Sequence, residues 1–284
     1  MDIKVVLKPE RRTFSFLYQA TLLVKGLIEE GVNASLDERF SNGEVVLWYA
    51  PFRTPEFERP KRYGKTQVFF NPIDTNTLSP VVKERVKADF DLIITPSTHN
   101  YKLYKETGVK TVKIPHMVNE DDLPDECELR EDTYYFMSKT FPIRRGTDIA
   151  LRVNGKKSSI NAHMRDHRTY LKTICKAGNF LAPVRGGAFE IEVLEALAMG
   201  MRVYYSEREI FDYITDIPPT FPVKGEYCKT EYGNDVFQTG CYDNVLDVIN
   251  PKQVNKPNAK HYITEFSPRK IAREFIKEVE KVAN

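Results

Sequence analysis

A turn with two adjacent glycines is the part of this sequence best suited to chemistry. Gly186 and Gly187 follow a short apolar run, and an amphipathic stretch up to Gly200 leads to a second apolar run. This order predicts a buried strand, a turn, a helix that ends at Gly200 and another strand. Glycine amides beside a helix N-terminus are a favourable binding site for a diphosphate, because N–H groups and the positive end of the helix dipole attract negative charge. The residues alone leave open an ordinary strand-turn-helix connection that binds nothing.

Three other groups of polar residues are candidates for a site. Thr13, Phe14 and Ser15 follow two arginines at the first strand-to-helix turn, and the carboxyl ends of parallel strands are the usual ligand crevice. His99 could line a cleft between domains, or it could be a polar residue at a helix start. His163 and His167 are spaced as on one helical face, but arginines lie between them and no third ligand is near. A basic loop or helix entry is therefore favoured over a metal pair.

The four cysteines do not follow a metal-binding pattern. Cys127, Cys175, Cys228 and Cys241 include no Cys-x-x-Cys pair and have no clustered histidines, which argues against a zinc site. A disulfide between Cys228 and Cys241 stays open, with free thiols as the default.

Length and charge limit the class of protein. A chain of 284 residues with 41% hydrophobic residues buries a sizeable core, and this length favours two modest domains with a cleft between them. The net charge is only +2, which argues against dedicated nucleic-acid binding. No run approaches the ~18 apolar residues of a membrane span, and the N-terminus resembles a strand rather than a signal peptide. We therefore expect a cytoplasmic protein without a membrane span.

The remaining apolar runs predict the elements that position these residues. Strands are expected at residues 3–7, 45–49, 67–70, 92–94 and 111–114, alternating with helix-like stretches at 16–28, 78–88 and 101–106. Such alternation indicates a parallel α/β sheet. After an acidic, loop-like segment at 115–132, a second α/β alternation begins with a strand at Tyr134–Met137 and includes a helix over Asp166–Lys176. Ser267 and Pro268 suit the start of a terminal helix.

The stretch from Phe180 to Tyr205 resembles the nucleotide-sugar-binding signature of GT-B glycosyltransferases of the large retaining class, which includes glycogen-synthase-like and mannosyltransferase enzymes. The matching residues are Pro183, Phe189, Glu195, Ala196, Ala198, Gly200 and Val203. The resemblance implies that Glu195 binds the ribose hydroxyls of the donor. It also implies that the backbone of Ala188, Phe189 and Glu190 faces the donor sugar and diphosphate.

Three other segments resemble the same family in the same order. Residues 138–148 are similar to a cationic element in which Lys139 and Arg145, followed by Gly146, would face the diphosphate. Residues 91–97 resemble the end of the acceptor domain, and residues 112–119 resemble the entry to the hinge. The family's first strand-to-helix loop often approaches donor or acceptor, which assigns that position to Thr13, Phe14 and Ser15.

The sequence departs from the family at three points. Gly187 stands where the family has a first glutamate that contacts the donor sugar, and Glu190 or Glu192 could replace it from one turn away. The segment between Arg145 and Phe180 is short, which suggests a lost or trimmed helix and strand. Asn71 lies near the strand end where the family often has a histidine.

These observations predict a GT-B fold of the α/β class, with two Rossmann-like domains facing across a cleft. The acceptor domain is expected at 1–116, the donor domain at 117–265, and a terminal helix at 266–284 that could pack back on the first domain. The resemblance implies a retaining, metal-independent hexosyltransferase without a cofactor. It would move a sugar from a nucleotide diphosphate sugar, with UDP or GDP, to a hydroxyl of a sugar, lipid or protein acceptor. The alternatives are a noncatalytic GT-B scaffold for a nucleotide or partner, and a nucleotide-sugar epimerase.

Overall fold

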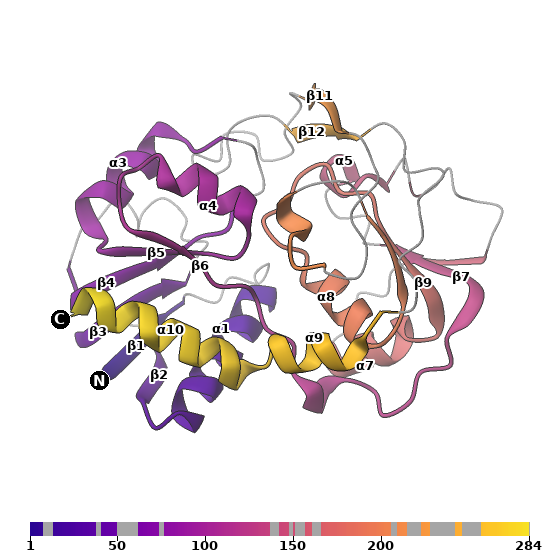
Figure 1. Ribbon diagram of the computed structural model, residues 1–284, viewed down its shortest axis with the longest axis horizontal. Helices are drawn as coiled ribbons and strands as arrows, with labels where there is room; N and C mark the ends of the chain where they lie inside the picture. Colours follow the sequence, from indigo (N-terminus) through magenta and orange to yellow (C-terminus); the bar gives the residue numbers. More distant parts are fainter. Residues whose placement is uncertain are drawn as a thin grey trace.

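Two parallel β-sheets, each flanked by helices, organise the chain (Figure 1). The computed structural model describes residues 1–7, 14–37, 41–49, 62–73, 77–136, 142–147, 150, 157–160, 166–205, 209–214, 223–227, 242–245 and 257–283. The first sheet lies wholly within residues 2–113 and the second within residues 130–205. The parts of the chain built on these two sheets are called below the first and the second domain.

The first sheet has six parallel strands in the order β2-β1-β3-β4-β5-β6. Their bounds are β1 Asp2–Val6, β2 Asn33–Asp37, β3 Gly43–Tyr49, β4 Gly64–Phe70, β5 Leu92–Thr95 and β6 Thr111–Lys113. The five predicted strands are confirmed. The sequence analysis missed β2, which lies at the edge of the sheet and has no apolar run.

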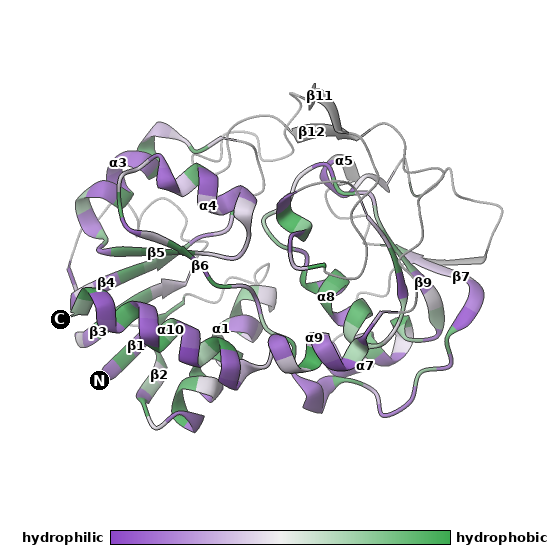
Figure 2. Cartoon of the chain, viewed as in Figure 1, coloured by the Kyte–Doolittle hydropathy of each residue, from purple (hydrophilic) through white to green (hydrophobic). Residues whose placement is uncertain are grey.

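Helices cover both faces of this sheet. α1 Phe14–Glu29 and α10 Pro268–Ala283 share one apolar cluster with the strands, to which Leu27 and Phe275 contribute. α3 Pro80–Asp89 and α4 Thr98–Lys105 lie over the other cluster, with Val86 and Tyr104. Figure 2 shows the strands as mostly hydrophobic and the helices as mixed in hydropathy along their length. Among the described helices, none is long and apolar enough to cross a membrane.

The second sheet has four parallel strands in the order β10-β9-β7-β8. They are β7 Arg130–Phe136, β8 Lys157–Ile160, β9 Ala177–Ala182 and β10 Arg202–Tyr205, with helices α5 Pro142–Arg145, α7 His167–Ile174 and α8 Ile191–Ala198. A separate antiparallel pair joins β11 Val223–Tyr227 and β12 Tyr242–Val245. β8, the next strand in sequence, pairs with one edge of β7, and β9 pairs with the other edge. The strand order therefore reverses between β7 and β9, and this is the topological switch point of the sheet.

The chain crosses between the domains at two neighbouring points. Near the first crossing, the Gln19 side chain of α1 accepts from the Met117 amide and donates to the Met117 carbonyl, both at 2.8 Å. Next to it, the Val118 amide donates to the carbonyl of Phe266, which follows α9 Ala259–Glu265. Before this second crossing, α9 packs beside α8 in the second domain. After it, α10 packs against α1 in the first domain (Figure 1).

Candidate functional site

The connections that follow β7 and β9 meet at the switch point of the second sheet. Phe136 and Leu181 are register partners, so the carboxyl ends of the two strands lie side by side. Beyond them, the carbonyl of Arg144 in α5 accepts from the amides of Arg185 at 2.8 Å and Gly186 at 3.3 Å. Ligands of open parallel sheets bind outside the carboxyl ends at such a point. The glycine turn thus lies where the topology of the sheet favours a ligand.

Gly146 allows α5 to approach the strand end this closely. Its backbone has φ +66°, in the left-handed region. A Cβ atom at this position would lie 1.9 Å from the Pro183 carbonyl oxygen. Both the conformation and the contact require glycine here.

Two arginines of α5 surround a buried carboxylate at the start of α8. Glu190 is 2% exposed and forms an ion pair with Arg145 Nη1. Arg144 Nη1 lies 4.0 Å from Glu190 Oε1, and Arg145 Nη2 lies 3.7 Å from Glu192 Oε1. A buried carboxylate needs such partners, because its desolvation is otherwise costly. These four residues form what we call the arginine–carboxylate cluster.

The Glu190 carboxylate occupies the space beside Gly187. A Cβ atom at residue 187 would lie 2.2 Å from Glu190 Oε1. A side chain at position 187 and the observed position of Glu190 therefore exclude each other. Among the described residues, nothing accepts a hydrogen bond from the Gly187 amide.

A second buried carboxylate, Glu195, lies further along α8. Its Oε1 is 2.7 Å from Nε2 of His167, the first residue of α7, and its Oε2 receives no hydrogen bond from any residue of the described ranges. Burial raises the pKa of Glu195, although the bond to His167 opposes the shift. Burial by itself would lower the pKa of His167, but the hydrogen bond and charge of Glu195 raise it overall. The pair therefore holds a proton more tightly than the same groups in water.

Tyr18 of α1 places the first domain against this pair. Its ring centroid lies 4.3 Å from that of His167, and its hydroxyl donates to Asp122 Oδ2 at 2.6 Å. Burial, assisted by the bond to Asp122, raises the pKa of Tyr18, so the hydroxyl stays protonated. Sequence reasoning missed Tyr18 and the pairing of His167 with Glu195, because these contacts join segments far apart in the chain.

The structure brings together only part of the predicted site. Arg145, Gly186, Gly187 and Glu190 meet at the switch point, with Gly146 behind them. Ala188 and Phe189 are buried and lie against the first domain. Glu195 is 1% exposed and lies further along α8.

The other predicted residues lie elsewhere. Ser15 is exposed at the start of α1, and His99 is half-buried in α4. Phe14 begins α1, with its side chain outside the described part of the structure. Lys139, Thr13, Cys228 and Cys241 also fall outside the described residues.

The sequence predicts that the amides of both glycines are available to a diphosphate, but the Gly186 amide already donates a hydrogen bond to the Arg144 carbonyl. Arg144 itself was overlooked, although its position beside Arg145 in a cationic segment was a usable signal. Within the described ranges, no group of three His, Cys, Asp or Glu side chains is arranged to hold a metal ion.

Comparison with known proteins gives one relative in sequence and several in structure. The chain is 28% identical to "Putative glycosyltransferase 45" of Sulfolobus islandicus filamentous virus (isolate Iceland/Hveragerdi), over 72% of this chain and 69% of that protein. No protein-family model matches.

Two solved structures are similar in fold. Sucrose-phosphate synthase from Thermosynechococcus elongatus has a TM-score of 0.55 and 12% identity, covering 100% of this chain and 95% of that one. The pneumococcal O-GlcNAc transferase GtfA, solved with UDP and GlcNAc, has a TM-score of 0.53 and 10% identity, covering 93% of this chain. The chain spans 60% of the length of GtfA. The predicted GT-B fold is thereby confirmed.

Proposed function

We propose that this protein is a glycosyltransferase that moves a sugar from a nucleotide diphosphate sugar to an acceptor hydroxyl. The observation that carries the proposal is the meeting of the glycine turn with Arg144 and Arg145 at the switch point of the second sheet. We assign the acceptor domain to residues 1–116, the donor domain to 117–265 and the returning terminal helix to 266–284.

The arginine–carboxylate cluster suits the departure of a diphosphate. During transfer, the acceptor oxygen bonds to the anomeric carbon and its hydroxyl proton passes to the leaving phosphate oxygen. The bond between that carbon and the phosphate oxygen breaks, and its electron pair leaves negative charge on the diphosphate. Arg145, the Gly187 amide and the N-terminus of α8 would stabilise this charge. Lys139 is proposed as a second cation on the same grounds of resemblance. With five N–H donors, the Arg145 guanidinium can keep its bond to Glu190 and also donate to the phosphate.

Glu190 takes the place of the missing first glutamate in this proposal. Its carboxylate lies where a side chain at residue 187 would begin, and two arginines keep it in that position. The loss of a glutamate at position 187 is therefore compatible with catalysis.

Glu195 would bind the ribose hydroxyls of the donor. Its Oε2 atom receives no hydrogen bond from the described residues, and it can accept one from a ribose hydroxyl once a movement exposes the side chain, which is 1% exposed in this structure. A second bond requires His167 to leave Oε1. Donor binding would then involve a movement of α7 or of the His167 side chain.

The finer features of the reaction belong to the same proposal. UDP is the first nucleotide to test, because GtfA was solved with UDP and GlcNAc and the Anabaena protein HepE, with a TM-score of 0.52, was solved with UDP-glucose. GDP is the second. Retention of configuration, independence of metal ions and a cytoplasmic location are inferred from the resemblance and from the sequence.

The test is a panel of UDP-, GDP- and ADP-sugars, incubated with the protein and with mixed sugar acceptors in the presence of EDTA. We expect release of nucleoside diphosphate from one donor, with the α anomer of the donor sugar retained in the product. Absence of turnover with every donor, with and without added Mg²⁺ or Mn²⁺, would contradict the proposal.

A noncatalytic nucleotide-binding scaffold is the second candidate. The observation that favours it is that the two buried carboxylates have internal partners, Glu190 with Arg145 and Glu195 with His167. Binding of a nucleotide without consumption of any nucleotide sugar would select this candidate.

A further inference from the structure

Residues of the first domain form a hydrogen bond and a ring contact with the turn that we propose binds the donor. Ser97, which follows β5 and caps α4, is fully buried, and its hydroxyl donates to the Ala188 carbonyl at 2.5 Å. The same oxygen accepts from the Asn100 amide at 3.5 Å, at the start of α4. The Ser97 hydroxyl therefore caps α4 in the first domain and also donates to the Ala188 carbonyl in the second.

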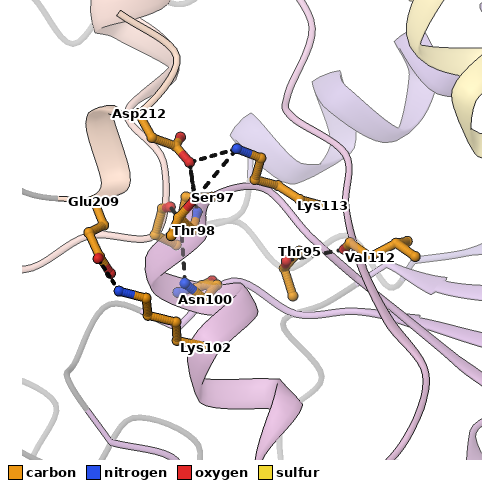
Figure 3. Close-up of polar contacts among 10 residues, drawn as sticks. Thr95, Ser97, Thr98, Asn100, Lys102, Val112, Lys113, Glu209 and Asp212 are labelled. Atoms are coloured by element: carbon orange, nitrogen blue, oxygen red, sulfur yellow. Dashed lines mark hydrogen bonds and ion pairs between the residues drawn. The ribbon is translucent and has the colours of Figure 1, made fainter.

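An acidic residue of the second domain reinforces this contact. Asp212 follows η2 Glu209–Phe211, and its Oδ2 accepts from the Thr98 amide at 3.0 Å and from the Thr98 hydroxyl. Lys113, at the end of β6, lies 2.8 Å from the same oxygen. Figure 3 shows Ser97, Thr98 and Lys113 gathered at the start of α4, with Asp212 facing them. A carboxylate suits this place, because the N-terminus of a helix favours negative charge.

An aromatic contact holds the next residue of the turn. The His116 ring centroid lies 5.1 Å from that of Phe189, with the rings nearly perpendicular. Burial lowers the pKa of His116 to about 3, so the ring is neutral at physiological pH. Phe189 also stacks on Tyr213 at 4.2 Å. Ala188 and Phe189 are thus both held by residues of the first domain.

We infer that Ser97 is a positioning residue for the donor turn, so that the contact between the domains sets how residues 187–190 meet the nucleotide sugar. This inference rests on the proposed function of that turn. Without the Ser97 hydroxyl, the buried Ala188 carbonyl lacks a hydrogen-bond donor. An unsatisfied buried acceptor costs free energy, and we expect the turn to rearrange because of this cost. Such a rearrangement moves the neighbouring Gly187 amide and the Glu190 backbone away from their positions at the switch point.

The test compares Ser97→Ala with a matched control in the same part of the fold. Thr95 lies two residues earlier, is fully buried, and donates to the Val112 carbonyl at 3.2 Å within the first domain; Figure 3 shows this bond as well. Thr95→Val removes a buried hydroxyl without touching the second domain. Because Ser97→Ala also weakens the cap of α4, Asp212→Asn serves as a second variant that alters the contact from the other side and keeps Ser97.

Two measurements are made on the full chain. The first is amide hydrogen exchange of residues 187–190 without nucleotide, and the second is donor KM and kcat with the sugar that the panel identifies. We expect faster exchange in Ser97→Ala and Asp212→Asn, and a KM about tenfold higher in Ser97→Ala with a smaller change in kcat, equivalent to ~1.4 kcal/mol. Thr95→Val should match the wild type in both.

Unchanged exchange at residues 187–190 in Ser97→Ala and Asp212→Asn would overturn the inference, and so would an equal response of Thr95→Val. The exchange measurement needs no nucleotide. A wild type that binds no nucleotide would therefore contradict the proposed function, while the exchange result would still decide whether Ser97 positions the turn.

Discussion

The two buried glutamates of α8 lie close in sequence but in different electrostatic surroundings. Glu190 has two guanidinium groups near it, which stay charged at any pH where the protein folds. Glu195 has one imidazole, whose charge depends on pH, and one oxygen without a donor among the described residues. The first carboxylate is held by fixed charge and suits a structural or phosphate-adjacent role. Glu195 is held by its bond to His167, an imidazole that can lose its proton. The contacts of Glu195 can therefore change when a ligand binds.

The largest effect is expected where the fixed charge meets the donor. Arg145→Ala should lower kcat/KM for the nucleotide sugar by about 10²- to 10³-fold, a few kcal/mol, because one preorganised cation is lost at the leaving diphosphate. Arg130→Ala is the control, since among the described residues its side chain pairs only with the exposed Glu128 of the same domain. Steady-state kinetics on both variants decides the point. Retention of full activity by Arg145→Ala would remove Arg145 from the site.

The next prediction tests the packing that holds Glu190. Gly187→Ala should destabilise the protein by about 1 to 3 kcal/mol, because the new methyl group overlaps the Glu190 carboxylate. In a Glu190→Ala background the same change should cost much less, since the space is then vacant. Urea unfolding of the two single variants and the double variant measures this coupling. Additive costs would show that Glu190 does not occupy that space.

The turn and its neighbours also show how far sequence reasoning reaches. The strand, turn and helix around Gly186 and Gly187 were predictable, because local periodicity and helix-terminating glycine determine them. The partners of these residues were not. Glu195 and His167 are 28 residues apart, and Ser97 and Ala188 are 91 apart, and such contacts depend on tertiary packing. β2 was not predicted from the sequence, because a strand that pairs with β1 at the edge of a sheet needs no apolar run.

The third prediction concerns the titratable pair. The folded state raises the pKa of both His167 and Glu195, so it holds a proton that the unfolded chain releases at lower pH. The contribution of the pair to stability is therefore fully present at low pH. It is lost as pH rises from the unfolded values, ~4.3 for Glu and ~6.5 for His, through the folded ones. As pH rises above the unfolded value of His, ~6.5, the free energy of unfolding should fall more steeply in the wild type than in Glu195→Gln.

Urea unfolding across this range provides the measurement. Glu131→Gln, at an exposed ion pair with Arg202 in the same domain, is the control and should keep the slope of the wild type. Identical slopes for wild type and Glu195→Gln would contradict the shared proton. Because Glu195 is buried and bonded to His167, this substitution is also expected to lower the melting temperature.

The smallest effect is expected at Glu192. Its carboxylate lies 3.7 Å from Arg145 and its side chain is 34% exposed. Glu192→Gln should change stability by less than ~1 kcal/mol, because partly exposed ion pairs contribute little. A Glu192→Gln effect as large as that of Glu190→Gln, measured by urea unfolding, would mean that burial does not distinguish the two carboxylates.

Calorimetric titration with UDP, GDP and ADP tests most directly whether the glycine turn and α8 bind a nucleotide. The wild type should bind one of the three, and Glu195→Gln should bind it with a dissociation constant raised by the equivalent of about 1 to 3 kcal/mol. Glu131→Gln, at an exposed ion pair with Arg202, should bind it about as tightly as the wild type does. Equal affinity of wild type and Glu195→Gln, or no binding of any nucleotide to the wild type, would contradict a nucleotide site on α8.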